Sequence, residues 1–390
     1  MNRPQISAAL RVWWRRLHVM TTKEMIQLLR DPMLMFLIVY AFTADVYNAG
    51  SGVTLQLKQA AVAVMDQDRS AASRELLSRF QPPYFRLAGS VANERAGQRL
   101  LDDADAMLVL TIPPQFEKSL ARGEQTQVQM QIDATNSVLG FLAYSYATQI
   151  VSTYGLQAAA QRLGLDPTGG IASGVPMVQN DQRVWYNPNQ NDAWFMSISE
   201  MLNVITLLAL LLPAAAMVRE KERGTIEQLL VSPLTPMQIM LPKVFAMTFV
   251  ILLGTGLSFL LVLKPVFGVP FRGSVALFLL ITAFYIVALS GLGLFIATIA
   301  RNLAQVGMLA ILLIAPMIFL SGAWTPPEAM PVVMRYAMFI SPLYYYIDAA
   351  YGIVLKGAGL DVLWPSVLGI LVFGSVTAAL GLWRFRRQFD

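Results

Sequence analysis

Long uncharged runs dominate the second half of the chain. Four of them hold 20, 28, 26 and 22 residues, and a fifth holds 18 residues immediately before Arg219. A helix of about 20 apolar residues crosses the hydrocarbon core of a bilayer. The pattern therefore predicts five membrane-spanning helices, at residues 194–218, 244–263, 273–300, 302–323 and 362–383.

A shorter apolar run lies near the N-terminus. It has 13 residues, 32–44, between Asp31 and Asp45. Its length alone also fits a buried core helix or an interfacial segment. Pro32 is a favoured first residue of a helix, and the helix can continue to Tyr47, so we predict a first span at 32–47. A signal peptide is not expected, because a long segment with acidic as well as basic residues precedes the run.

Residues 1–31 predict an interfacial elbow helix. Apolar side chains recur at helical spacing, and arginines lie between them. Helices of this kind lie on lipid headgroups, with their aromatic side chains toward the acyl chains and their basic ones toward water. A plain soluble tail is the alternative. The apolar positions are Ile6, Leu10, Trp13, Leu17 and Met20.

Residues 48–193 have the composition of a water-soluble block. Short β-like runs alternate with helical ones, which predicts a compact α/β domain between the first and second spans. Ser70 is placed to cap the first of these helices, and Pro113-Pro114 ends one strand and opens the next helix. The predicted strands are 60–65, 84–87, 106–112, 127–132 and 184–186, and the predicted helices are 71–80, 93–101, 113–120 and 136–163.

Residues 324–361 interrupt the apolar pattern of the second half. Several prolines lie within this stretch, so a continuous helix cannot form. We predict a broken, partly re-entrant pair of short helices at the outer face. Irregular backbone is not tolerated against lipid, so this segment must pack against protein or water.

The composition narrows the class of protein. Hydrophobic residues make up 56% of the 390 and charged residues only 14%, which is about half of the 25% typical of soluble domains. One large soluble globule is therefore excluded. The chain has no cysteine and His18 is its only histidine, which excludes thiolate and histidine metal sites, so no metal is expected. The net charge of +5 is too small and scattered to indicate nucleic-acid binding.

The basic residues predict the orientation. With six crossings and a cytoplasmic N-terminus, the inner segments are 1–31, 219–243, Arg301 and 384–390, and they hold 14 basic and 6 acidic residues. The outside takes the remaining 15 basic and 18 acidic residues. Lysine and arginine favour cytoplasmic loops, so the inverted topology is rejected. Both termini are predicted to be cytoplasmic.

The segment after the second span is densely charged. Arg219 to Arg223 are five charged residues in succession, and Gly224 then turns the chain. Thr225 can cap a short helix at 226–230, and Pro233 ends it. This pattern predicts a rigid, projecting helical segment between two spans. The alternative is an ordinary loop that the charges keep solvated.

This charged segment resembles the coupling region of ABC-2 type transporter permeases, where Glu, Arg, Gly-Thr, Glu and Pro recur in this order. Lys23-Glu24, Gln27 and the 30–32 run Arg-Asp-Pro resemble the family's elbow before its first span. The layout is similar too: one span, a large outer domain, then five spans with a broken outer element before the last. The stretches 60–68 and 109–116 look like outer domains of the drug-efflux branch. The resemblance covers essentially the whole chain, although the short first span departs from it.

The resemblance implies a polytopic α-helical membrane protein with six transmembrane helices and an α/β periplasmic domain between helices 1 and 2. It implies the permease subunit of an ATP-driven exporter of amphipathic or hydrophobic compounds in a bacterial inner membrane. A coupling helix would dock into a separate ABC ATPase, which uses ATP with Mg²⁺. The implied ATPase-coupling residues are Glu220, Glu222, Arg223, Gly224, Thr225, Ile226, Glu227, Leu229, Leu230 and Pro233.

The resemblance also bears on catalysis and partners. The chain has no G-x-x-x-x-G-K-[ST] phosphate loop, so it is not expected to hydrolyse ATP or to bind a cofactor itself. ABC transporters need two permease halves, which implies a homodimer or a heterodimer. The outer domain would meet a periplasmic adaptor and, through it, an outer-membrane duct. The alternative is a membrane-anchored receptor or scaffold with a ligand-sensing outer domain, but that class needs fewer spans.

One carboxylate lies at the predicted outer start of the second span. A charge at the membrane is costly and often functional, so Glu200 is a candidate for a substrate pathway, with Asn203 and Thr206 beside it. Equally, Glu200 can reach water at the interface, while Asn203 and Thr206 form hydrogen bonds between helices. Glycines in the spans predict close helix contacts; these are Gly254, Gly256, Gly291 and Gly293.

Overall fold

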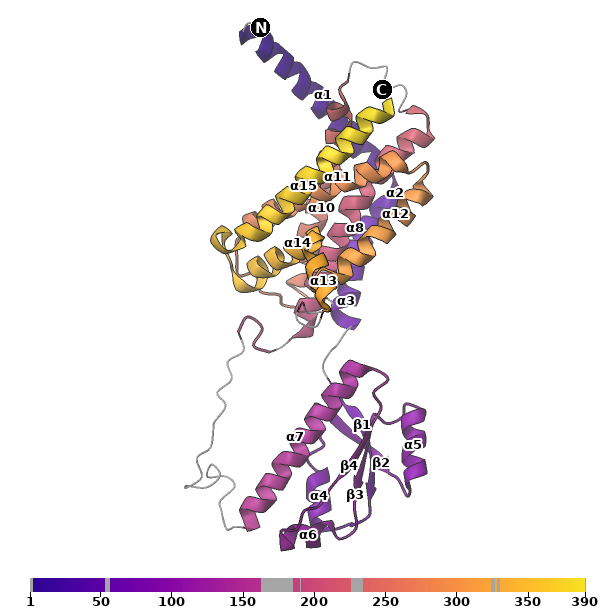
Figure 1. The fold of residues 1–390 in the computed structure, drawn as a ribbon, viewed down its shortest axis with the longest axis vertical. Coiled ribbons are helices and arrows are strands. Elements are labelled where there is room, and N and C mark those ends of the chain that lie inside the picture. The colour runs from indigo at the N-terminus through magenta and orange to yellow at the C-terminus, as the bar shows by residue number, and fades with distance from the viewer. Residues whose placement is uncertain are drawn as a thin grey trace. The chain divides into compact units, whose positions relative to one another are not determined.

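The computed structural model describes residues 3–52, 57–162, 185–189, 191–225, 234–323, 327 and 330–389. The chain divides into two compact units. Residues 54–183 form an α/β unit, and residues 1–53 together with 184–390 form a helical unit (Figure 1). This division follows the change in composition between the polar block and the apolar runs.

The α/β unit is built on a four-stranded sheet in the order β2-β1-β3-β4. Strand β1 (Ala60–Asp66) pairs parallel with both β2 (Phe85–Ser90) and β3 (Leu108–Ile112). Strand β4 (Gln129–Ile132) pairs antiparallel with β3. The connecting helices are α4 (Ala71–Leu77), α5 (Glu94–Asp102), α6 (Phe116–Arg122) and α7 (Ser137–Arg162). The predicted alternation of strands and helices is present.

Helices cover both faces of this sheet (Figure 1). Ala143 and Ala147 of α7 are fully buried in a core that also contains Val62 and Leu110. On the other face, α5 packs so closely that a Cβ at Gly97 would lie 3.0 Å from Val109 Cγ1. Both faces of the central strands are thus buried, as expected of parallel strands between helices.

Local capping fixes the helix starts in this unit. Ser70 Oγ accepts a hydrogen bond of 3.1 Å from Ser73 N, which confirms the predicted cap of α4. Asn93 caps α5 in the same way, through Ala96 N at 2.8 Å. The prediction of a strand at 184–186 is wrong for its described part, because Tyr186 has φ +66°, which no strand accommodates. Val184 lies outside the described residues.

Five helices of the helical unit are long and apolar enough to cross a membrane. They are Pro32–Gly52, Asp192–Glu222 (α8), Pro236–Leu263, Val275–Ile299 (α11) and Leu360–Arg387, the last within α15 (Leu360–Phe389). Helix α12 (Leu303–Phe319), at the position of the predicted 302–323 span, has only 17 residues. The bent pair Val332–Ile340 and Pro342–Lys356 is a further candidate, so the described residues hold five or six candidate spans.

The first candidate span extends beyond the predicted end at Tyr47. It runs through α2 (Pro32–Tyr40), a π-helical turn η1 (Ala41–Asp45) and α3 (Val46–Gly52). Asp31 Oδ1 caps its start by accepting from Leu34 N at 3.1 Å. Phe42 of the π turn is fully buried against Gly254 of α10 (Pro236–Ser258), where a Cβ would collide with its ring. The apolar run alone underestimates the length of this helix, because the last turns of the helix contain polar residues.

The helix is broken within residues 324–361, as predicted from the prolines there. Its parts are α13 (Val332–Ala337), η4 (Met338–Ile340), α14 (Pro342–Tyr351) and η5 (Gly352–Lys356), and the two halves are bent by 83°. Buried tyrosines hold α14 in place. Tyr346 stacks on Tyr285 of α11 at 4.0 Å, and its hydroxyl lies 3.0 Å from Thr282 Oγ1.

Helix α8 is the centre of the helical unit, and small residues let α11 approach it. A Cβ at Gly293 of α11 would collide with the carbonyl oxygen of Leu210, which is fully buried in α8. Gly254 and Gly291 also lie against neighbouring side chains or backbone. Gly256 was predicted to do the same, but within the described part of this chain a Cβ there would meet nothing within 4 Å.

We expect Gly293→Ala to destabilise the helical unit by about 1–3 kcal/mol, because the added methyl must push two packed helices apart. Thermal unfolding of the detergent-purified protein measures the effect. Gly256→Ala is the matched control, since alanine there occupies open space and favours the helix. Equal melting temperatures for the two variants would contradict this account of the contact.

Candidate functional site at the charged helix ends

Four charged side chains meet where α1 (Arg3–Leu29), α8 and α10 come together. Lys243 Nζ lies 2.8 Å from Glu24 Oε1 and 2.8 Å from Glu220 Oε2. Lys23 pairs with the same two carboxylates and lies 3.1 Å from Glu24 Oε1. We call these four residues the charge cluster. It links α1 to the end of one candidate span and the start of another.

Three members of the charge cluster are buried, Lys23 closes it from the exposed side, and its charges balance. Lys243, Glu24 and Glu220 are exposed by only 1%, 2% and 3%. Two positive and two negative groups leave no net charge in a site of low dielectric, which is the condition for burying them. Burial lowers the pKa of Lys23, but its contacts with Glu220 and Glu24 outweigh this and leave the pKa raised. Lys23 is therefore positively charged at neutral pH.

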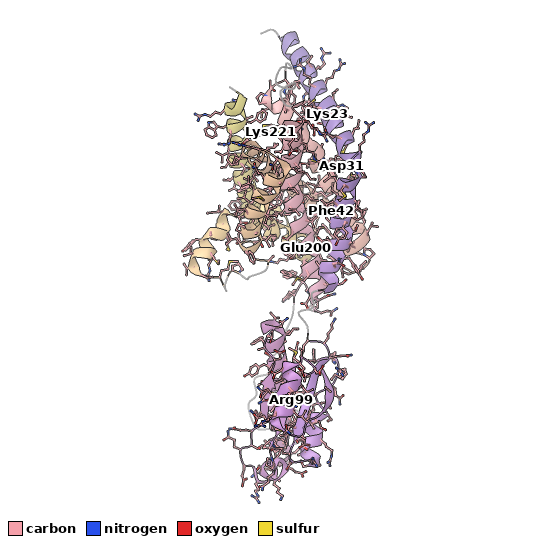
Figure 2. The ribbon with its side chains drawn as sticks, turned by 90° about the vertical axis from the view of Figure 1, so that its right-hand side faces the viewer. Lys23, Asp31, Phe42, Arg99, Glu200 and Lys221 are labelled. Atoms are coloured by element: carbon pink, nitrogen blue, oxygen red, sulfur yellow. The ribbon has the colours of Figure 1, made fainter. Side chains whose placement is uncertain are left out.

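A second ion pair ties the same elements together. Arg219 Nη1 lies 2.8 Å from Asp31 Oδ2. The backbone N–H of Leu34, followed by Arg219, keeps the pKa of Asp31 below its usual range. The residue that starts the first candidate span is thus bound to α8. Figure 2 shows Lys23, Asp31 and Lys221 toward one end of the helical unit and Glu200 farther along it.

The end of α8 is anchored to its neighbours before the chain turns. Glu222 Oε1 accepts from Leu303 N at 2.9 Å, at the start of α12. Lys221 Nζ donates to the carbonyl oxygen of Ala297 in α11. Gly224 then takes φ +68°, the left-handed conformation that its sequence position predicts. Thr225 Oγ1 donates back to Glu220 O at 3.2 Å.

Hydrogen bonds also fix the start of α10, which follows the charged segment. Thr235 and Gln238 form a capping box at the start of α10, with Thr235 N donating to Gln238 Oε1 at 3.0 Å. Pro236 occupies the first turn, and Gln238 is buried. Both ends of the segment are thus fixed by hydrogen bonds. The predicted helix at 226–230, with Ile226, Glu227, Leu229, Leu230 and Pro233, lies outside the described residues.

The structure changes the role available to Glu220. Sequence reasoning placed it with Glu222 and Arg223 on a surface that contacts an ATPase. Glu222 and Arg223 are exposed, but the carboxylate of Glu220 is buried in the charge cluster. Its carboxylate is therefore not on the exposed surface that was predicted, and its pairs with Lys23 and Lys243 hold the end of α8. Sequence reasoning also missed Lys243, which it took as the end of a loop.

The three residues considered for a substrate pathway do not form one group. Asn203 Nδ2 lies 3.4 Å from Glu200 Oε2, so these two are neighbours. Thr206 is fully buried, donates to Leu202 O at 2.7 Å and lies 2.9 Å from Tyr285 Oη. Thr206 therefore joins α8 to α11. A pathway at Glu200 and Asn203 remains a prediction.

The helical unit has the long apolar helices of a membrane protein, and comparison with known proteins identifies the family. Residues 25–383 match the family described as "ABC-2 family transporter protein", and the chain belongs to it. ABC-2 permeases are transport subunits that work with ABC ATPase partners.

The chain is similar to curated permeases over nearly its whole length. It is 34% identical over 365 residues to the inner membrane transport permease YhhJ of Escherichia coli (strain K12), covering 94% of this chain and 95% of that one. It is 29% identical to the probable multidrug ABC transporter permease YbhR of the same strain, covering 96% and 99%. YbhS, another probable multidrug permease, is 26% identical, covering 97% and 98%.

Proposed function

We propose that this chain is the permease subunit of an ATP-driven exporter that moves amphipathic or hydrophobic compounds out of the cell. It would lie in the bacterial inner membrane with both termini in the cytoplasm. A second permease copy, identical or related, would complete the pathway. The ATP and Mg²⁺ would be bound by a separate ABC ATPase, and the α/β unit would face the periplasm, toward an adaptor and an outer-membrane duct.

The observation that carries the proposal is the anchoring of the 223–235 segment at both ends. A segment that transmits movement between an ATPase and the membrane helices must be rigidly attached to those helices at both of its ends. Glu222, Gly224 and the capping box at Thr235 fix its ends. The charge cluster then connects α8 and α10 to the elbow helix. A movement imposed on the segment by an ATPase would thus reach three helices at once.

Two further observations support the topology. Both chain termini lie at the same end of the helical unit (Figure 1), which is where the charge cluster lies. The lysine and arginine excess of the predicted inner segments belongs to this end. The printed names of YbhR and YbhS, probable multidrug ABC transporter permeases, support a drug-like cargo.

Arg223→Glu tests the proposed contact with the ATPase. Arg223 is exposed at the end of α8, where it can contact a partner. Reversing its charge should weaken co-purification of the ATPase and lower ATP-driven efflux of a fluorescent amphipathic dye from inverted vesicles, each by on the order of tenfold.

Arg301→Glu is the matched control for this experiment. Arg301 is also exposed and lies on the segment between α11 and α12. We expect this variant to retain ATPase binding and efflux. If no candidate ABC ATPase binds the wild-type chain, or if Arg223→Glu exports dye at the wild-type rate, the proposed coupling is wrong.

A further inference from the structure

Two carboxyl groups meet inside the helical unit, away from the charge cluster. Asp45 lies in the first candidate span and Glu200 lies in α8, and their carboxyl groups are within hydrogen-bonding distance of each other. Figure 2 shows Glu200 within the helical unit, beyond Phe42 as seen from Lys23. Both side chains of the pair are partly exposed. Carboxylates within membrane spans are costly, and they mark pathways for cargo or ions.

The described part of the chain supplies no basic side chain to balance this pair. None of the ion pairs among the described residues includes Asp45 or Glu200. Two carboxylates in contact repel each other unless a proton or a cation lies between them. In the charge cluster, by contrast, two lysines supply the balance. The Asp45–Glu200 pair therefore needs a proton or a positive group that the described residues do not supply.

Asn203 adds an unpaired hydrogen-bond acceptor beside the two carboxyl groups. Its side chain is only 8% exposed, and its Nδ2 lies 3.4 Å from Glu200 Oε2. Its Oδ1, bonded to the same carbon, is buried and has no hydrogen-bond partner among the described residues. A buried acceptor without a partner is unfavourable. A proton shared by the carboxyl groups leaves this oxygen unpaired, whereas a ligand with its own N–H group can donate to it.

An apolar stripe of α8 extends from the carboxyl pair along the helix. Leu207 and Leu211 follow Glu200 by seven and eleven residues, which is about two and three helical turns, so the three side chains share one face. Leu207 is 38% exposed and Leu211 is partly exposed, whereas the other residues from 201 to 210 are buried. A ligand that reaches from Glu200 to Leu207 spans about 10 Å. The face therefore presents negative charge at one end and apolar surface beyond it.

We propose that this site recognises the charged nitrogen of an amphipathic organic cation on the pathway that exports it. Asp45 and Glu200 supply the negative charge, and Asn203 Oδ1 accepts from an N–H group of the cation. Leu207 contacts the apolar part of the molecule. The cargo pathway is itself proposed, so this site rests on the proposed function and narrows its cargo to cations. An inorganic cation would gain nothing from the apolar stripe, which favours an organic one.

Binding of two dyes to the full-length permease in lipid nanodiscs tests this site. Rhodamine 6G is a cationic amphipathic dye with N–H groups, and Nile red is a neutral dye without them. Glu200→Gln with Asp45→Asn removes the negative charge and keeps the side-chain shapes. The affinity for rhodamine 6G, measured by fluorescence anisotropy against empty nanodiscs, should fall by on the order of tenfold, and that for Nile red should not change. The control, Asp348→Asn with Asp361→Asn, removes two exposed carboxylates elsewhere in the helical unit and should bind both dyes like the wild type.

Two single substitutions test the other parts of the site. Asn203→Ala removes the amide acceptor, so it should weaken binding of rhodamine 6G and leave binding of Nile red unchanged. Leu207→Ala should weaken binding of both dyes by about threefold, because it removes apolar contact that does not depend on charge. Leu253→Ala, at an exposed position of α10 outside the stripe, is the matched control and should bind both dyes like the wild type.

Three outcomes would overturn the proposal. Wild-type affinity for rhodamine 6G in the Asp45 and Glu200 double variant would show that the carboxyl pair holds only a proton. Equal loss of both dyes in that variant would show that the site does not recognise charge. Loss of a dimer, with dye binding unchanged, would assign the carboxylates to contact with a second copy of the chain. Failure of the proposed function is distinct: charge-dependent binding by a wild-type chain that transports neither dye with any ABC ATPase would support the cation site and overturn the export role.

Discussion

Replacing Lys243 with methionine is expected to lower the free energy of unfolding of the helical unit by about 3–5 kcal/mol. The substitution removes one of two positive charges from the charge cluster and leaves Glu24 and Glu220 buried together with only Lys23 between them. The cost comes from the uncompensated carboxylate, since methionine itself fits an apolar site. Loss of folded protein on heating in detergent, followed by size-exclusion chromatography, measures it.

A double variant separates the cost of an unpaired charge from the cost of lost packing. Glu24→Met with Lys243→Met removes one charge of each sign and leaves the Lys23–Glu220 pair intact. Replacing a buried ion pair by apolar groups of similar size is often neutral or stabilising, so most of the lost stability should return. Lys264→Met, at an exposed position, should behave like the wild type. Equal destabilisation by the single and double variants would show that unpaired charge is not the cause.

Local patterns in the sequence predict much of this fold. Uncharged runs predict the long helices because a span needs about 20 apolar residues whatever surrounds it. Short apolar runs predict the central strands of the α/β unit. Ser70 predicts a helix start, because capping depends on residues three positions apart. The π turn at Ala41–Asp45 was not predicted, since its residues fit an ordinary helix equally well.

The charge cluster could not be predicted in the same way, because Lys243 lies 219 residues from Glu24 in the chain. No local pattern pairs them. One signal was available in α1, where Glu24 shares a helix face with Leu17 and Leu28, both of which are buried. A carboxylate on an apolar face predicts a buried partner. That signal would have indicated that Glu24 needs a cation, although not which one.

The burial of Glu220 was missed for a different reason. Its neighbours in sequence are charged, so the segment reads as exposed throughout. The structure shows that α8 continues as a helix to Glu222, which turns Glu220 inward and leaves Glu222 and Arg223 outside. Helical periodicity beyond the end of the uncharged run would have predicted this difference. The exposed part of the proposed contact with an ATPase therefore begins at the last turn of α8.

The Glu24→Met, Lys243→Met double variant is also expected to uncouple transport from ATP hydrolysis. It should fold and bind the partner ATPase, because the exposed residues Glu222 and Arg223 are untouched. It lacks the links that Lys243 makes from α10 to α1 and α8. If those links carry movement of the 223–235 segment to the elbow helix, ATP-driven dye efflux should fall by about tenfold, within the range of typical coupling free energies.

The readouts distinguish loss of coupling from loss of assembly. Co-purification of the ATPase and its basal ATP hydrolysis should match those of the wild type, while dye-stimulated hydrolysis and efflux fall together. Lys264→Met, which changes the same residue type at the exposed position directly after the same candidate span, should leave all four quantities unchanged. Wild-type efflux in the double variant would show that the charge cluster holds the fold together and transmits nothing. The movement would then have to pass from the segment through α8 alone, by way of Glu222 and its bond to α12.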